Sequence, residues 1–362
     1  MPSTLKHDAA VAWRKSLAVL VGILLFSYFL SMALGLLLFY MSPGGLDVAS
    51  RQVVELPLSI LMIVNFRMPL GISAAAFFLV MWFLYVAAFA CAWFDRQDFP
   101  SSFKDLMAHS DLLRSNYLVV LPQLASALLV AVVLLQTLQE SAGVQTGGIS
   151  FESPFVGFLT VSYAPLLEEL SYRITTVGLF DALYLLWSKN RVAGGQGRRK
   201  TIHLVALTMW NPDRTKELLG FNTIRNDGLR KGISRFEWVL LVLTSGAFGA
   251  VHYLSGGGWE IGKISTAMLS GLAMGIVYLR YGAYAPILLH WFFNYYFGAF
   301  DLASQLNLAG ADAIALGIEL LNLGVGTVLL IVAVGVSVAR VWASSGRARQ
   351  VKGDCVGRSP NV

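Results

Sequence analysis

Long apolar runs, separated by short polar stretches, dominate this chain. A helix that crosses a membrane needs about 20 mostly apolar residues, because the lipid core offers no partner for exposed backbone groups. The pattern predicts about eight such helices, at residues 16–40, 70–94, 117–138, 155–187, 237–254, 262–280, 283–300 and 314–342. We therefore expect an all-α fold, a polytopic bundle of membrane helices.

Two segments depart from this pattern. Residues 53–66 are apolar but short and contain Pro57, which predicts an interfacial or re-entrant segment. Residues 188–236 are the one long polar stretch between two predicted spans. We expect a cytoplasmic loop against the lipid headgroups here, with substrate gating as the alternative. Within this loop Asn211 and Pro212 predict a helix start, with Asn as the N-cap and Pro at the first helical position.

Composition and charge support a membrane protein. Hydrophobic residues make up 56% of the chain and charged residues 13%, which is too little charge for the surface of a soluble domain. The net charge of +6 indicates basic loops near anionic lipids and no nucleic-acid partner, since no basic motif with interleaved aromatic residues occurs. With the N-terminus in the cytoplasm, 23 of the 27 Lys and Arg residues fall on the cytoplasmic side. Both termini are therefore predicted to be cytoplasmic.

The fourth predicted span carries three ionisable residues in the run from Pro165 to Arg173. Such residues within lipid each cost about 2.5–3.5 kcal/mol on insertion scales. Glu169 and Arg173 are four residues apart and can form an ion pair on one helix face. Glu168 is rotated from Glu169 by about 100° and has no partner in this span. It must be neutral, bound by another helix or exposed to a water-filled cavity. A structural ion pair beside a neutral glutamic acid is the simpler alternative.

Two further spans contain histidine. His252 ends the run Phe248-Gly-Ala-Val-His252, and His290 begins the run His290-Trp-Phe-Phe-Asn294. His290 and Asn294 are four residues apart, so both side chains point the same way. Taken singly, His252 is equally explained as a packed or interfacial residue, Phe248 as packing, and the last pair as an interhelical hydrogen bond.

If the three spans converge, a carboxylate, two imidazoles and a carboxamide share one site. A buried carboxylate can act as a general base with the help of an imidazole. Imidazole and amide N–H groups can stabilise an oxyanion. Alternatively, Glu168, His252 and His290 form a ligand set typical of catalytic zinc, with water in the open position. The residues leave both alternatives open.

The motifs Glu-Glu-x-x-x-Arg, Phe-x-x-x-His and His-x-x-x-Asn on successive membrane helices resemble those of the CPBP family. This family includes the eukaryotic type II CAAX prenyl endopeptidase and prokaryotic intramembrane peptidases of the Abi group. The resemblance covers about residues 155–300. It implies an intramembrane endopeptidase that hydrolyses membrane-associated protein or peptide substrates with an activated water.

Roles for individual residues follow from the resemblance. It implies that Glu168 activates water with His252 as its partner, that Glu169 and Arg173 form or orient the site, and that the His and Asn of the third motif hold the oxyanion. The family has been described both as metallopeptidases and as glutamate-dependent peptidases. Bound zinc and a metal-free glutamate mechanism are therefore both expectations.

The predicted organisation has three parts. Residues 1–154 form N-terminal membrane helices, 155–300 a peptidase-like core with the insertion 188–236, and 301–362 the last membrane helix with a basic cytoplasmic tail. The expected partners are a membrane protein or peptide substrate and the lipid bilayer. The expected location is the plasma membrane in a prokaryote, or the endoplasmic reticulum membrane in a eukaryote.

Two other functions compete with the peptidase. One is a catalytically silent membrane scaffold with the same fold, which would keep the polar residues without cleaving a substrate. The other is a proton-coupled transporter, since intramembrane Glu and His suit a proton relay. Transporters often show inverted repeats with matching broken helices, and the sequence shows neither.

Overall fold

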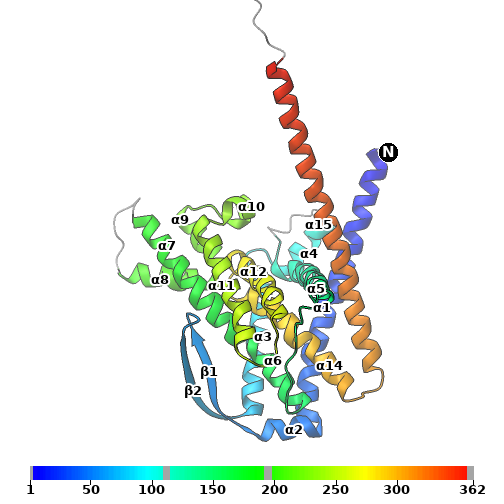
Figure 1. The fold of residues 1–362 in the computed structure, drawn as a ribbon, viewed down its shortest axis with the longest axis vertical. Helices are drawn as coiled ribbons and strands as arrows, with labels where there is room; N and C mark the ends of the chain where they lie inside the picture. The colour runs from blue at the N-terminus through cyan, green and yellow to red at the C-terminus, as the bar shows by residue number, and fades with distance from the viewer. Residues whose placement is uncertain (1–2, 109–114, 191–197, 357–362) are drawn as a thin grey trace, which may run out of the picture.

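The computed structural model describes residues 3–108, 115–190 and 198–356 and is mostly helical (Figure 1). The end of the predicted C-terminal tail, 357–362, lies outside the described residues. Within the described residues, six helices are long and apolar enough to cross a membrane. They are α1 (Ser3–Met41), α3 (Ala74–Trp93), α5 (Tyr117–Ser141), α11 (Arg235–Leu254), α12 (Gly262–Tyr281) and α15 (Ala311–Val356). These helices coincide with six of the eight predicted spans, and the helical membrane bundle is confirmed at this level.

The other two predicted spans are helical but interrupted. The span 155–187 consists of α6 (Pro154–Glu169), the π-helix η1 (Leu170–Val177) and α7 (Gly178–Asn190). The span 283–300 consists of α13 (Tyr284–Trp291), the π-helix η2 (Phe292–Tyr296) and α14 (Phe297–Gln305). A π-helix bonds each N–H to the carbonyl five residues earlier and occurs often at functional sites. That these two broken helices cross the membrane stays a prediction.

The expectation of an all-α fold is wrong between α2 (Pro43–Ser50) and α3. Residues 53–66 lie in β1 (Gln52–Ile60) and β2 (Val64–Ser73), which pair as an antiparallel hairpin, and the interfacial or re-entrant position of this segment stays a prediction. The span predicted from residue 70 therefore begins only at α3. Pro57 is tolerated because each strand of a two-stranded sheet has a free edge.

The tip of the hairpin is held in an unusual backbone conformation against η1. Leu61 and Met62 have φ values of 55° and 62°, a left-handed region that residues other than glycine seldom adopt. The Leu61 N–H donates to Thr175 Oγ1 at 3.1 Å, and Met62 packs against the buried cluster of Tyr172 and Phe248. These contacts hold the strained turn in place.

The insertion 188–236 is folded where the structure describes it. It contains α8 (Arg198–Trp210), α9 (Pro212–Leu219) and α10 (Ile224–Gly232). The predicted helix start is confirmed, since Asn211 Oδ1 accepts from the Arg214 N–H at 3.0 Å at the start of α9. The cytoplasmic location of this segment stays a prediction.

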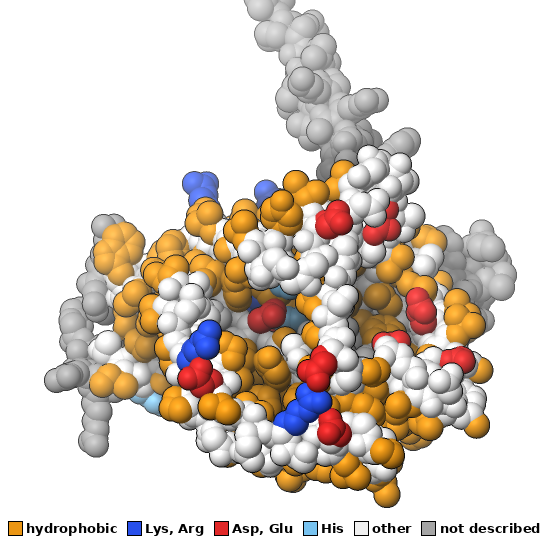
Figure 2. Space-filling view, turned by 60° about the horizontal axis from the view of Figure 1, so that its bottom comes forward, with side chains coloured by type: hydrophobic (Ala, Val, Ile, Leu, Met, Phe, Trp, Pro, Cys, Tyr) orange, Lys and Arg blue, Asp and Glu red, His pale blue; other side chains and the backbone are white. Residues whose placement is uncertain are grey.

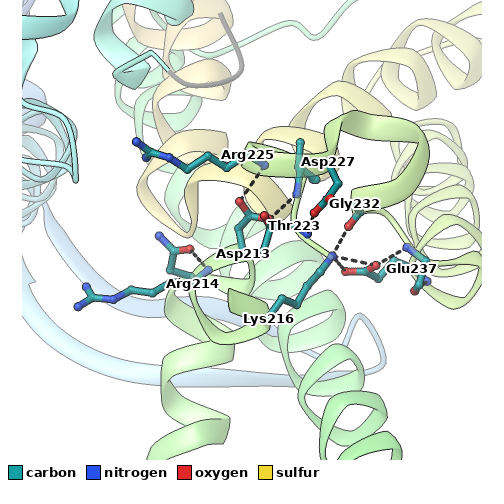
Figure 3. A network of polar contacts seen from close by, with 11 residues as sticks. Asp213, Arg214, Lys216, Thr223, Arg225, Asp227, Gly232 and Glu237 are labelled. Carbon is teal, nitrogen blue, oxygen red and sulfur yellow. Dashed lines mark hydrogen bonds and ion pairs between the residues drawn. The ribbon is translucent and has the colours of Figure 1, made fainter. Parts of the chain in front are cut away.

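Buried charges attach the insertion to the start of α11 (Figure 3). Lys216 Nζ lies 2.8 Å from Glu237 Oε1, and both side chains are buried. The carboxylate of Asp213 accepts from the backbone N–H groups of Ile224 and Arg225, at 2.7 and 3.2 Å. Buried charges persist only when they are paired and hydrogen-bonded. The network therefore fixes α9 and α10 against α11, which carries His252.

An aromatic core surrounds α13 and η2. Trp291, Phe292, Tyr295 and Tyr296 are fully buried, and the Tyr296 ring lies 4.7 Å from that of Tyr28 in α1, edge to face. Offset and edge-to-face ring packing restricts the rotation of these helices. The N-terminal end of α1 and the C-terminal end of α15 lie at the same end of the molecule (Figure 1). The cytoplasmic location of both termini stays a prediction.

Candidate active site

The end of α6 and the start of η1 hold a buried ion pair. Arg173 Nη1 donates to Glu169 Oε1 at 3.1 Å, as the spacing of four residues predicts. Arg173 Nη2 donates to the Gly271 carbonyl at 3.1 Å, and the guanidinium carbon lies 4.4 Å from the centroid of the Phe248 ring. A Cβ atom at position 271 would come within 3.0 Å of Nη2. Glycine at this position therefore leaves the room that the guanidinium occupies.

His290 connects the two glutamates. Its Nδ1 lies 2.9 Å from Glu169 Oε1, and its Nε2 lies 3.8 Å from Glu168 Oε2. An ionised carboxylate can only accept, so His290 Nδ1 carries a proton and donates it to Glu169. The distance from Nε2 to Glu168 exceeds hydrogen-bonding range. Glu169 therefore orients the imidazole, whose other nitrogen points toward Glu168.

Glu168 opens into a large pocket. The side chain of Glu168 is 32% exposed, and its Oε2 atom has no hydrogen-bond partner. The pocket has a volume of about 900 Å³, and Glu168, His252, His290 and Asn294 all line it. Figure 2 shows a hollow in this face of the molecule, with acidic and histidine side chains inside it. Four of the six predicted site residues thus share one pocket.

His252 reaches the pocket from α11. Its Nδ1 lies 2.7 Å from the Phe248 carbonyl oxygen, which can only accept. Nδ1 therefore carries the proton, and Nε2 of the neutral ring keeps its lone pair. The Phe248 ring packs edge to face against both imidazoles, with centroid distances of 4.6 Å to His252 and 5.9 Å to His290. Phe248 does pack, as expected, and it also separates the two histidines.

Asn294 approaches from the π-helix η2. One N–H of its Nδ2 donates to the Val161 carbonyl of α6 at 3.1 Å. The amide nitrogen carries two hydrogens, so one N–H remains for a group in the pocket. Both helices that supply the central residues change to π-helix beside them, since Glu169 precedes η1 and Asn294 lies within η2.

Glu168, His252 and His290 were predicted as one possible set of zinc ligands. Zinc needs three or four ligand atoms that converge on one point. Among the described residues, no group of three or more His, Cys, Asp and Glu side chains is arranged to hold a metal ion. Glu168, His252 and His290 share the pocket without converging in that way. Bound zinc and a metal-free glutamate mechanism both stay predictions, and the steps below use only side chains of this chain.

One residue that lines the pocket was not predicted from the sequence. Lys263, in the first turn of α12, lines the pocket, and its Nζ lies 3.8 Å from the centroid of the Trp259 ring. The predicted span 262–280 contains Lys263, for which the sequence predicted no role. Its position 11 residues after His252 gave no indication that it enters the site.

Residues 150–296 match the model of a family described as Rce1-like, the type II CAAX prenyl endopeptidases. The matched segment contains all six candidate residues, and the predicted resemblance is confirmed over this part of the chain. Comparison with curated proteins and with solved structures gave no significant match. The match leaves α1 to α5, α14 and α15 outside it, and the division at residues 154 and 300 stays a prediction.

Proposed function

We propose that this protein is an intramembrane endopeptidase that hydrolyses membrane-associated protein or peptide substrates with a water activated by Glu168. One observation carries the proposal, the contrast between two adjacent glutamates. Glu169 is fully buried, pairs with Arg173 and His290 and does not line the pocket, whereas the side chain of Glu168 is 32% exposed and lines it. A carboxylate that faces a pocket can bind a water there and take its proton.

The first step is attack by water. A general base must come within about 2.6–3.2 Å of the atom whose proton it takes. A water in the pocket can bond to the exposed part of the Glu168 carboxylate, close to His290, whose Nε2 lies 3.8 Å from Glu168 Oε2. As the water oxygen bonds to the substrate carbonyl carbon, its proton passes to Glu168. The unprotonated Nε2 of His252 can accept a second hydrogen bond from the same water.

The carbonyl oxygen becomes an oxyanion in this step. The free amide N–H of Asn294 can donate to it. His290 Nε2 can donate to it as well when both ring nitrogens carry a proton.

The second step is release of the amine. Glu168 now carries the proton taken from water and gives it to the nitrogen of the scissile bond as the carbon–nitrogen bond breaks. The products are one carboxylic acid and one amine, which exchange the remaining proton to become a carboxylate and an ammonium group, and Glu168 is ionised again. The same side chain thus acts first as base and then as acid.

Cleavage itself is the first prediction. Purified wild-type protein in detergent, incubated with a proteome-derived peptide library, is expected to produce new peptide termini that mass spectrometry detects. The corresponding Glu168→Gln sample should produce none of them. A folded wild-type protein that cleaves no peptide would contradict the proposal and favour the scaffold or the proton-coupled transporter.

Chelation is the second prediction. Because the steps above need no metal, treatment with EDTA or 1,10-phenanthroline is expected to leave the cleavage rate within about twofold of the untreated rate. Zinc content, measured on the same samples by mass spectrometry, provides the control. A loss of activity that added zinc restores would assign water activation to the metal and contradict the glutamate mechanism.

A further inference from the structure

Lys263 is the one Lys or Arg among the described residues that line the pocket. It is half-buried, and no ion pair joins it to an acidic side chain in the part of the chain that the structure describes. A cation that enters a largely apolar pocket without a partner lacks the compensation that such charges normally have. A ligand with a negative charge would provide that compensation.

Trp259 sets the position of this cation. The Lys263 ammonium lies 3.8 Å from the centroid of the Trp259 ring, the range of a cation–π contact. An ammonium group has three N–H donors, and a ring face satisfies none of them fully. The contact therefore restrains the side chain while leaving donors for a second partner. Trp259 is itself fixed, because its backbone pairs with Gly147 in an isolated β-bridge.

The acidic residues of the pocket divide into two groups. The first group is Glu168, the proposed base. Asp301 and Glu319 line the pocket from α14 and α15. An anionic group of a bound peptide would be repelled by those two acids and attracted by Lys263. The pocket thus offers one cation for a negative charge, Lys263, and Glu168 lines the same pocket.

We propose that Lys263 binds a carboxylate of the substrate and so determines which peptide bond is presented to Glu168. This inference rests on the proposed peptidase function. The carboxylate is either the free C-terminus of the substrate or an acidic side chain close to the scissile bond, which offer the same chemistry. Lys263 would act through the binding of substrate and take no part in bond breaking.

The test uses three versions of one peptide, based on a sequence that the wild-type protein cleaves in the library. The first version keeps all its carboxylates, the second has an amidated C-terminus, and the third has its acidic side chains replaced by amides. We expect the wild-type kcat/KM to fall about tenfold for either the second or the third version, mostly through KM. Which of the two falls identifies the source of the carboxylate.

Variants then assign the effect to Lys263. Lys263→Met is expected to cleave all three peptides with the reduced kcat/KM that the wild type shows for the peptide without the recognised carboxylate. Lys263→Arg is expected to keep the wild-type difference in kcat/KM between the peptides. Arg67→Met is the matched control, because Arg67 is 79% exposed on the hairpin, outside the pocket lining, and its loss should change none of the rates.

Different results would overturn different proposals. A wild-type protein that cleaves all three versions equally would overturn the role of Lys263, even if the variants fail to fold, and would leave the peptidase intact. A Lys263→Met protein with a uniformly lower kcat would also overturn it, because Lys263 would then act on Glu168. No cleavage of any peptide by the wild type would instead contradict the peptidase itself.

Discussion

Replacing Glu168 by Gln is expected to lower kcat/KM by roughly 10²–10⁴-fold, the range that a positioned general base contributes. Glutamine has nearly the same size and can still bond to water, but it cannot take the water's proton. The stability of the protein should change little, because Glu168 Oε2 has no hydrogen-bond partner to lose. Initial rates on a cleaved peptide and thermal unfolding in the same detergent measure the two effects.

Glu319→Gln is the matched control for this experiment. Glu319 lines the same pocket from α15 but is exposed and has no contact with His290. The same change of one carboxylate to an amide should therefore leave the rate near that of the wild type. Turnover that is normal in Glu168→Gln would refute the role of Glu168 as base. An equal loss in both variants would indicate that only the total charge of the pocket matters.

Arg173→Met is expected to lower the free energy of unfolding by about 3–5 kcal/mol, the range measured when one partner of a buried ion pair is removed. The variant leaves the carboxylate of Glu169 buried without its cation and the Gly271 carbonyl without its donor. Unfolding of the detergent-solubilised protein by heat or denaturant measures the loss. An Arg173→Met protein as stable as the wild type would refute the structural importance of the pair.

A second substitution separates the lost charge from the lost packing. In the double variant Arg173→Met/Glu169→Gln the unpaired carboxylate is gone, so a large part of the stability should return. Its activity should stay low, because His290 has lost the carboxylate that orients it. Arg67→Met again gives the comparison, since Arg67 and Glu55 form an exposed pair whose loss should cost about 0–1 kcal/mol.

The features that the sequence predicted correctly are those set by length and local spacing. Uninterrupted apolar runs predicted six helices, and a spacing of four residues predicted the pair of Glu169 and Arg173. The Asn211 cap also depends only on adjacent residues. Each of these follows from the geometry of one helix, which the neighbouring helices do not alter.

Features that depend on packing between segments escaped prediction. The apolar run 53–66 is short, and short apolar runs do not distinguish strands from interfacial helices. Its turn at Leu61 and Met62 lacks the glycine or asparagine that usually marks a tight hairpin, because contacts with η1 stabilise it instead. The π-helices likewise carry no separate signal in their apolar sequences. Lys263 enters the pocket only through the way α11 and α12 pack.

The open edge of the hairpin also restricts which groups can lie beside η1. β1 packs against η1, while β2 forms the outer edge of the sheet (Figure 1). Open sheet edges do not occur in contact with lipid chains, because their N–H and C=O groups would have no partner. Headgroups, water or protein must therefore border β2 along its length, up to the tip that bonds to Thr175. Wherever β2 lies at the depth of the bilayer, this polar border extends to the hairpin tip, whose partner Thr175 is six residues after Glu169.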